Sequence, residues 1–157
     1  VLASASPRRQ ELLKMLCVED LRIIPAVGEE IIANGMTPAE AVCSLSLAKA
    51  REVSKLCTFE DIIIAADTVV SVDGRILGKP LDKEDAFQML ERLSGKTHIV
   101  FTGVTVLKGN LIITEYERTS VNFRELTERE IRAYIETGEP MDKAGAYGAQ
   151  GIGSLFV

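Results

Sequence analysis

Tryptophan is absent from this 157-residue sequence, and aromatic residues make up only 5% of it. We therefore expect a core built mainly from aliphatic side chains. The single histidine, His98, has no G-x-S-x-G or C-x-x-C motif beside it, so a catalytic histidine is not favoured. Neither a Walker A motif nor a G-x-G-x-x-G motif after a strand is present, which excludes nucleotide binding of the P-loop and Rossmann types.

The sequence also lacks an excess of basic residues and a long apolar run. The sequence contains 18 Lys and Arg residues and 23 Asp and Glu residues, which gives a net charge of −5. This charge argues against binding of a nucleic acid polymer. A local basic pocket for a small anion stays possible. The longest apolar run, Ile62–Ala66, is far too short to cross a bilayer, and no signal peptide is visible. We expect a cytoplasmic protein without a membrane partner.

Cysteines are few and are not arranged as metal or disulfide motifs. Cys17, Cys43 and Cys57 are odd in number and form no C-x-x-C, which predicts buried, reduced thiols. The length suits one domain covering residues 1–157. Because the chain opens at Val1 and closes on an apolar run, we expect it to be part of a longer chain.

Helix and strand signals alternate along the chain. Helices are predicted from capping residues and apolar spacing at 6–16, 37–56, 82–93 and 127–137. Strands are predicted at 1–3, 21–26, 62–66, 69–72, 75–77, 97–107 and 111–123, with an Asp-Gly hairpin at 73–74 and a glycine-rich loop over 141–157. The mixture of hairpins and crossovers predicts an α/β fold with a mixed, twisted sheet flanked by helices.

Positive charge is concentrated at the start of the first predicted helix. Ser6 is suited to the N-cap and Pro7 to the first turn, yet Arg8 and Arg9 follow where the helix dipole already favours anions. One interpretation is a site for phosphate or carboxylate, with the arginines beside helix N–H groups. The other is that both arginines pair with surface acids such as Glu11.

Asp67 directly follows the predicted buried strand 62–66, and ligands of open α/β sheets gather at the carboxyl ends of strands. A carboxylate at such a tip can bind Mg²⁺ or accept a proton from water. The alternative is an Asx turn, in which Asp67 binds its own backbone. The functional interpretation is favoured because Thr68 returns at once to a strand pattern.

Other candidate residues are ambiguous by themselves. Lys79 follows the predicted hairpin and, taken by itself, is more typical of a solvated charge; Lys49, in an amphipathic helix, is similarly ambiguous. Glu30, beside another glutamate, is more typical of an exposed acidic pair than of a metal site. The loop 141–151 can bring backbone N–H groups and the Gln150 amide to a planar ligand, or it can be an ordinary flexible loop.

Several of these motifs, taken in order, resemble the Maf family of nucleoside triphosphate pyrophosphatases, also called septum-formation inhibitors. The motifs are SASPRRQELL at 4–13, ADTVV at 66–70, GKP at 78–80, LSG at 93–95 and DKAGAYG at 142–148. The resemblance covers essentially the whole chain. It implies a fold with two lobes around a nucleotide cleft, similar to that of inosine triphosphatase, and a further C-terminal segment in family members.

The resemblance implies cleavage of a nucleoside triphosphate to the monophosphate and pyrophosphate with a divalent cation, Mg²⁺ or Mn²⁺. It implies that Asp67 is the proton acceptor, that Glu30 and Asp67 hold the metal, and that Glu30 and Lys79 assist catalysis. Substrate contacts are then expected from a basic and polar set: Ser6, Arg8, Arg9, Lys49, Asp142 and Lys143.

The motifs S-P-R-R, A-D-T and A-Y-G-x-Q-G resemble the branch of the family that acts on dTTP and UTP, with Arg8, Thr68 and Gln150 as specificity positions. The implied role is removal of unwanted nucleotides, by a protein with a small-molecule nucleotide as its partner and a possible homodimer. The alternative from the same resemblance is a nucleotide-binding regulator of septum formation that has no physiologically important turnover.

Overall fold

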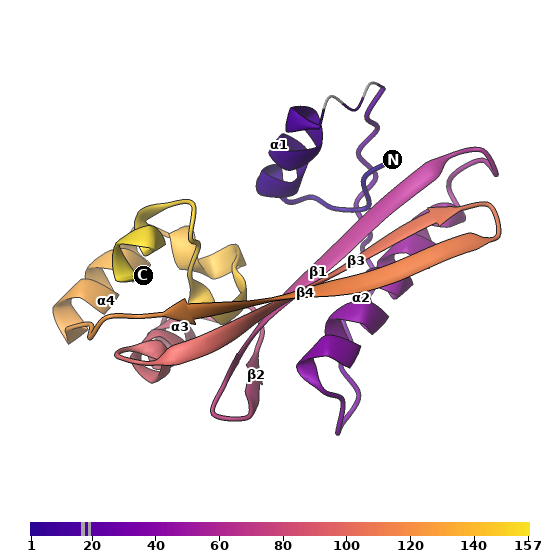
Figure 1. The fold of residues 1–157 in the computed structure, drawn as a ribbon. Helices are drawn as coiled ribbons and strands as arrows, with labels where there is room; N and C mark the ends of the chain where they lie inside the picture. The colour runs from indigo at the N-terminus through magenta and orange to yellow at the C-terminus, as the bar shows by residue number, and fades with distance from the viewer. Residues whose placement is uncertain (17, 19) are drawn as a thin grey trace. The chain divides into compact units, whose positions relative to one another are not determined.

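The computed structural model describes residues 1–16, 18 and 20–157, and its elements confirm the predicted α/β class (Figure 1). Its helices are α1 (Pro7–Met15), α2 (Pro38–Ser54), α3 (Lys83–Leu93) and α4 (Glu128–Glu136). Its strands are β1 (Ile62–Val72), β2 (Arg75–Leu77), β3 (Thr97–Lys108) and β4 (Leu111–Asn122), in the order β2-β1-β3-β4. Short 3-10 turns occupy the predicted C-terminal loop: η1 (Glu139–Asp142), η2 (Ala144–Ala146) and η3 (Ile152–Phe156).

The four-stranded sheet is antiparallel, and the parallel pairings in the described residues are isolated bridges. β1 and β2 run antiparallel around the Asp73-Gly74 turn, where φ is 49° and 73°. Both residues are therefore left-handed, as a two-residue Asp-Gly hairpin requires. At the N-terminus, Leu2 forms isolated parallel bridges to Ile64 of β1 and to Ile23.

The strand predicted at 21–26 is wrong apart from the bridge at Ile23. Leu2 donates its N–H to the carbonyl of Arg22 over 2.8 Å and accepts the N–H of Ile24 over 3.0 Å. Pro25 follows immediately and has no N–H to continue such a ladder. The pairing therefore stops after one residue.

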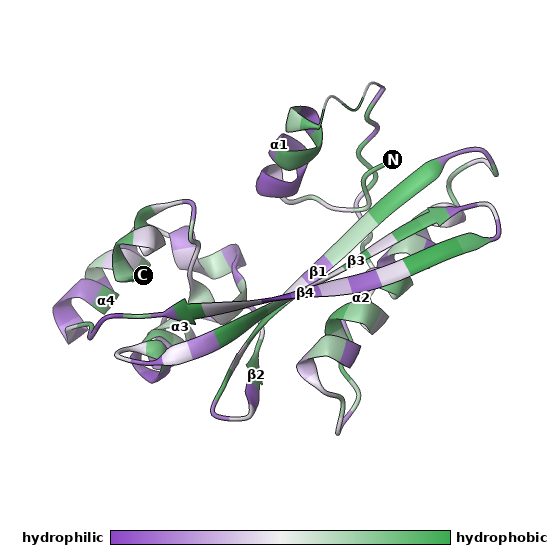
Figure 2. Ribbon diagram, viewed as in Figure 1, coloured by the Kyte–Doolittle hydropathy of each residue, from purple (hydrophilic) through white to green (hydrophobic). Residues whose placement is uncertain are grey.

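β1 is one continuous strand from Ile62 to Val72, whereas the sequence predicts two strands separated by Asp67. Its first half is strongly hydrophobic (Figure 2). Asp67 thus lies within a strand and not at a strand tip, and its side chain is buried, with 5% of the residue exposed. The argument from the carboxyl ends of strands does not apply to this residue.

The chain divides into two compact units, which are described separately. Unit 1 consists of Val1–Asp67 and Thr102–Glu117, and unit 2 of Thr68–Phe101 and Arg118–Val157. The long strands β1, β3 and β4 each contribute residues to both units.

In unit 1, α2 packs closely on β3. A Cβ at Gly103 would lie 2.4 Å from the carbonyl oxygen of Val42, so only glycine permits this approach. A chain of hydroxyl groups joins α2, β3 and β4: Ser46 Oγ lies 2.9 Å from Thr105 Oγ1, which lies 2.9 Å from Thr114 Oγ1. Ser46 and Thr105 are fully buried, and these mutual hydrogen bonds satisfy their hydroxyl groups.

In unit 2, the apolar faces of α3 and α4 share a core with aromatic residues. Leu90, Leu93 and Ile131 are each at most 2% exposed. The Phe123 and Tyr147 rings meet edge to face with centroids 4.6 Å apart, the arrangement that ring quadrupoles favour.

Capping explains where α2, α3 and α4 begin. The side chain of Thr37 accepts the N–H of Glu40, and that of Thr127 accepts the N–H of Glu130, each in a complete capping box. Asp82 caps α3 by accepting the N–H of Asp85 over 2.8 Å. These three predicted helix starts are confirmed, since each depends on neighbouring residues alone.

Two further sequence expectations concern cysteines and membranes. Cys43 and Cys57 are free thiols, but both are only partly buried, so the expectation of full burial is wrong for them; Cys17 lies outside the described residues. Burial raises the pKa of the Cys43 thiol, with a smaller contribution from Glu115. Within the described part of the chain, no helix has the length and apolarity needed to cross a membrane.

Candidate active site

The candidate site in unit 1 is centred on one ammonium group and two carboxylates. Lys49 of α2 binds Asp67 Oδ1 on β1 through its Nζ, and the same Nζ lies 2.6 Å from Glu30 Oε1. Helix, strand and irregular segment therefore each supply one charged side chain. Because a buried carboxylate without a partner is costly, Lys49 makes the buried position of Asp67 tolerable.

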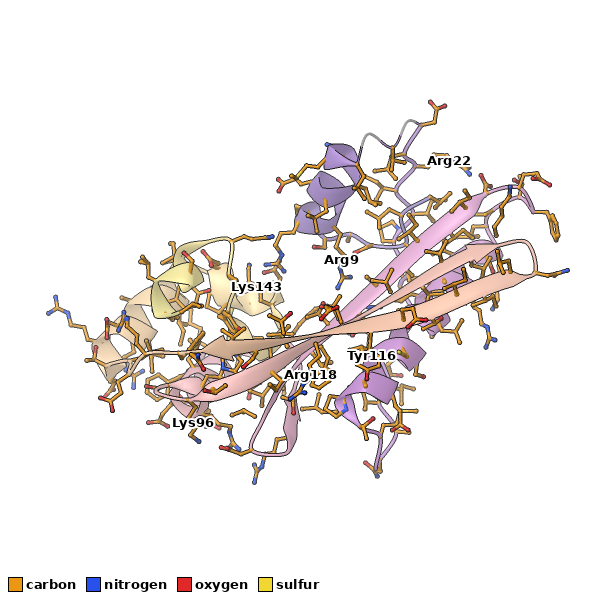
Figure 3. The ribbon with its side chains drawn as sticks, in the orientation of Figure 1. Arg9, Arg22, Lys96, Tyr116, Arg118 and Lys143 are labelled. Carbon is orange, nitrogen blue, oxygen red and sulfur yellow. The ribbon has the colours of Figure 1, made fainter. Side chains whose placement is uncertain are left out.

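Arg9 brings a second cation to the same place. Its Nη1 donates to the carbonyl oxygen of Ala66 over 2.7 Å and to Ser4 Oγ over 3.2 Å, so the side chain extends from α1 toward β1 (Figure 3). Burial lowers the pKa of Arg9, while the nearby Asp67 carboxylate opposes that effect. These contacts run inward to the residue next to Asp67, which favours the anion-site interpretation over pairing with Glu11.

The start of α1 presents positive potential, as the sequence suggests. Ser6 occupies the N-cap position, but its side chain makes no capping hydrogen bond, and instead its N–H donates to Ser4 Oγ over 3.2 Å. The first turn holds no acidic residue, and Arg8 is partly exposed there. Since a helix N-terminus favours anions, Arg8, Arg9 and α1 combine their effects at one end of the helix.

The two carboxylates, of Glu30 and Asp67, suit a hard divalent cation whose coordination is completed by other ligands. Glu30 and Asp67 contact the same ammonium group, so a positive charge is stable beside both carboxylates. Among the residues that the structure describes, no group of three or more His, Cys, Asp or Glu residues is placed to hold a metal. Mg²⁺ commonly binds through one or two carboxylates together with water and substrate phosphates, so these two residues fit it.

In unit 2, the structure brings two of the sequence motifs together. The N–H of Gly145 donates to the carbonyl of Gly78 over 2.9 Å, which joins the segment of Lys79 to that of Asp142 and Lys143. A Cβ at Gly145 (φ 67°) would lie 2.7 Å from the Val70 side chain, so glycine is required there.

The two charged residues of this segment contact each other. Lys143 Nζ lies 2.6 Å from Asp142 Oδ1 and donates to the Glu139 carbonyl over 2.6 Å. Lys79 is exposed beyond the end of β2.

The proposed specificity positions differ in exposure. Arg8 and Thr68 are partly buried, Thr68 within β1, and Gln150 is exposed in the C-terminal loop. Gln150 is followed by a turn whose backbone is held by Glu139: its carboxylate accepts the N–H groups of Ile152 (2.9 Å) and Gly153 (3.2 Å). The hydroxyl of Tyr134 donates to the same carboxylate over 2.9 Å.

Sequence reasoning overlooked Glu139 and also Glu52, a residue of α2 whose carboxylate binds backbone N–H groups near Glu30. A weak signal for Glu139 exists in Gly151 and Gly153, where added Cβ atoms would lie 2.5 Å from its carboxylate and 2.7 Å from the Tyr134 hydroxyl, respectively. For Glu52 the signal is its spacing of three residues from Lys49 on one helix.

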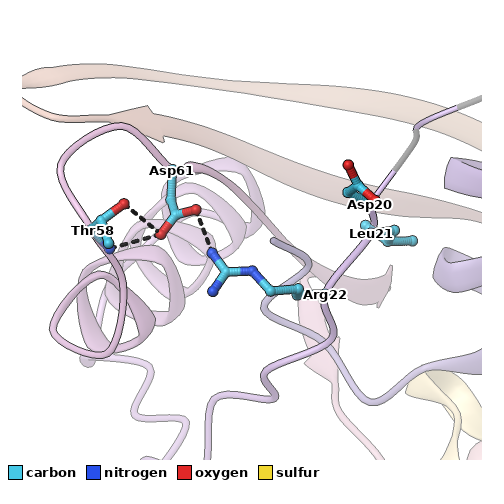
Figure 4. Close-up of a pocket in the computed structure, with 5 residues that line it drawn as sticks. All are labelled: Asp20, Leu21, Arg22, Thr58 and Asp61. Atoms are coloured by element: carbon cyan, nitrogen blue, oxygen red, sulfur yellow. Dashed lines mark hydrogen bonds and ion pairs between the residues drawn. The ribbon is translucent and has the colours of Figure 1, made fainter.

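A hollow in unit 1 is lined by Asp20, Leu21, Arg22, Thr58 and Asp61 (Figure 4). Hydrogen bonds from Arg22 and from the backbone and side chain of Thr58 hold the pKa of Asp61 at about 2. This carboxylate is already satisfied within the protein, and none of the predicted site residues lines the hollow. We assign it a structural role in tying two loops together.

Comparisons with known proteins identify the family of this chain. The family model described as "Maf-like protein" matches residues 1–157, and the chain belongs to this family. It is 50% identical over 157 residues to proteins of Bacillus cytotoxicus and Bacillus anthracis that are named dTTP/UTP pyrophosphatase; the match covers 100% of this chain and 81% of each relative.

Among solved structures, the chain is similar to a crystal structure from Mycobacterium abscessus titled as a nucleoside-triphosphatase / dITP/XTP pyrophosphatase. The identity is 16%, the TM-score is 0.49, and the similarity covers 80% of this chain and 74% of the other.

Proposed function

We propose that this protein hydrolyses dTTP and UTP to the monophosphate and pyrophosphate. The observation that carries the proposal is the cluster of Asp67, Lys49, Glu30 and Arg9 in a chain 50% identical over its whole length to proteins named dTTP/UTP pyrophosphatase. Carboxylates and guanidinium groups in one place suit metal-assisted attack on a phosphoric anhydride.

In the proposed reaction, Asp67 accepts a proton from the water that attacks the α-phosphorus. A bond forms between the water oxygen and this phosphorus, the bond to the bridging oxygen breaks, and pyrophosphate leaves with the bonding electrons. Asp67 is suited to this task because its carboxylate is buried within the cluster and lies against the Lys49 ammonium group.

Basic and polar residues contact the substrate in this proposal. In unit 1, we assign this role to Ser6, Arg8, Arg9 and Lys49, since arginine forks and helix N–H groups bind phosphate oxygens. In unit 2, we assign substrate contacts to Lys79, Asp142 and Lys143, with Lys79 also stabilising developing charge. Arg8, Thr68 and Gln150 are proposed to select the pyrimidine base.

Glu30 and Asp67 would hold the divalent cation, which we propose to be Mg²⁺, with Mn²⁺ as a substitute. When bound, such a cation neutralises phosphate charge and lowers the barrier to attack. On the family resemblance, we further propose a cytoplasmic homodimer with a nucleotide as its small-molecule partner and no nucleic acid polymer as ligand.

The test compares the unchanged protein with Asp67→Asn, using each common ribo- and deoxyribonucleoside triphosphate with Mg²⁺. We expect thymidine and uridine monophosphates with pyrophosphate, little product from purines, no product with EDTA, and turnover at least about 100-fold lower in Asp67→Asn, within the range of lost general-base catalysis. Ion-exchange chromatography separates the products.

Three results would contradict the proposal. Formation of diphosphate and orthophosphate would show that a different bond is broken. Near-normal turnover in Asp67→Asn would remove this residue from the chemistry. Nucleotide binding without any product would instead indicate a regulator that binds nucleotides.

A further inference from the structure

Glu52 lies three residues after Lys49 on α2, so the two side chains share one face of the helix. Its Oε1 accepts the N–H of Val27 over 2.8 Å and that of Gly28 over 3.2 Å, and its Oε2 accepts the Gly28 N–H over 3.1 Å. One carboxylate therefore holds the backbone just before Glu30.

Gly28 is fitted closely to this carboxylate. A Cβ at residue 28 would lie 2.7 Å from Glu52 Oε2, closer than such atoms approach in proteins. Any larger residue must therefore displace either the Glu52 side chain or the backbone that it binds. Spatial crowding, and not a left-handed backbone, is the reason for glycine here.

The segment around Glu30 lies outside the helices and strands. Residues 24–33 form neither helix nor strand, and Gly28, Glu29 and Glu30 are exposed. The Lys49–Glu30 ion pair leaves 41% of the Glu30 side chain exposed, and solvent weakens pairs of this kind. The N–H groups of Val27 and Gly28, which donate to Glu52, add a restraint on the backbone that leads to Glu30.

We propose that Glu52 is a positioning residue that fixes residues 27–30 so that Glu30 meets Lys49 beside Asp67. Lys49 and Glu52 lie on neighbouring turns of α2. Lys49 binds the carboxylate of Glu30, and Glu52 binds the backbone N–H groups of the residues that precede it. This inference rests on the proposed function, in which Glu30 and Asp67 hold the divalent cation.

The test compares Glu52→Ala and Glu52→Gln with Arg51→Ala, an exposed neighbour on the same helix. In Glu52→Ala, we expect Mn²⁺ affinity, followed by electron paramagnetic resonance, to fall at least about ten-fold, as for other residues that orient metal ligands. The Mg²⁺ concentration for half-maximal turnover should rise by a similar factor. Hydrogen exchange of the residue 27–28 amides in the metal-free protein should also become faster.

Glu52→Gln should stay within about three-fold of the unchanged protein, since its amide oxygen still accepts both N–H groups. Arg51→Ala should change none of these quantities. A positioning role predicts normal metal dependence in Glu52→Gln and a shifted metal dependence in Glu52→Ala. Circular dichroism of each variant measures whether a general loss of stability accounts for the difference. Normal Mn²⁺ affinity and normal exchange in Glu52→Ala would overturn the proposal.

Gly28→Ala provides an independent variant, because it disturbs the same contact from the other side. Gly28→Ala should weaken Mn²⁺ binding when it is made in the unchanged protein, and it should have little further effect when it is added to Glu52→Ala. If the losses of Mn²⁺ affinity in the two single variants added fully in the double variant, the result would count against a shared contact. If the unchanged protein released no pyrophosphate, the proposed function would fail, and exchange and Mn²⁺ binding would still decide the role of Glu52.

Discussion

His98 is a buried residue in the core of unit 2, with 1% of it exposed. Its Nε2 lies 2.7 Å from the Tyr147 hydroxyl, and its ring packs edge to face on Phe123. Burial lowers the pKa of His98 and raises the pKa of Tyr147 to about 12. The sole histidine is thus a core residue held in its neutral form, which agrees with the sequence argument against a catalytic role.

Acidification should therefore destabilise the protein through His98. The folded-state pKa lies below the ordinary value of about 6.5, so the unfolded chain binds a proton first, and stability is lost as pH falls below about 6.5. Urea unfolding at pH 7.5 and 5.5 measures this loss, with His98→Gln as the variant that cannot titrate there. The variant should be less stable at both values but should depend less on pH; an equally steep dependence would contradict the assignment.

At Asp67, the sequence predicts a candidate site residue but not the structure that surrounds it. An aspartate after five apolar residues usually ends a strand, and only a tertiary partner lets the strand continue. That partner, Lys49, lies eighteen residues earlier on α2, so no local pattern reveals the pairing. Local signals were sufficient for the capped helix starts and the Asp-Gly turn, and insufficient for the strand at 21–26.

Among the elements, the C-terminal turns depend on one acidic side chain. Burial raises the pKa of Glu139, but hydrogen bonds from Ile152, Gly153 and Tyr134 outweigh this effect and leave the pKa lowered. The same three groups would lose their acceptor if the carboxylate were removed. Glu139 is therefore expected to determine the order of the segment that contains Gln150.

Glu139→Ala should lower the free energy of unfolding by about 1–3 kcal/mol, the usual cost of leaving partly buried donors unpaired. The matched control is Glu136→Ala, which removes an exposed carboxylate that pairs only at the surface with Lys83 and should change stability by less than about 1 kcal/mol. Denaturant unfolding monitored by circular dichroism compares the two. Equal effects would show that the turns do not depend on Glu139.

At the scale of the whole molecule, two hydrophobic clusters share no residue. One contains Ile63 of β1 with Ala50 and Val53 of α2, and the other contains Leu90 of α3 with Ile131 of α4. Each cluster lies within one unit, so damage to one leaves the contacts of the other intact.

Ile63→Val should cost about 0.5–1.5 kcal/mol and Leu90→Ala about 2–5 kcal/mol, because each leaves space in a buried cluster. In the double variant the two losses should add to within about 0.5 kcal/mol, as for substitutions without shared partners. Chemical unfolding of the three variants tests this. A coupling above about 1 kcal/mol would show that the clusters respond to each other.

The division into units has a consequence for synthesis on the ribosome. The chain leaves unit 1 after Asp67, returns after Phe101 and leaves again after Glu117. Many proteins fold their N-terminal domain while the remainder is still being translated. This order does not apply here, because unit 1 lacks its parts of β3 and β4 until residue 117 has left the ribosome. By then Thr68–Phe101 of unit 2 has left the ribosome too. Unit 1 therefore cannot be complete until Thr102–Glu117 has been made, after the first segment of unit 2. Unit 2 cannot be complete until Arg118–Val157 has been made, after all of unit 1.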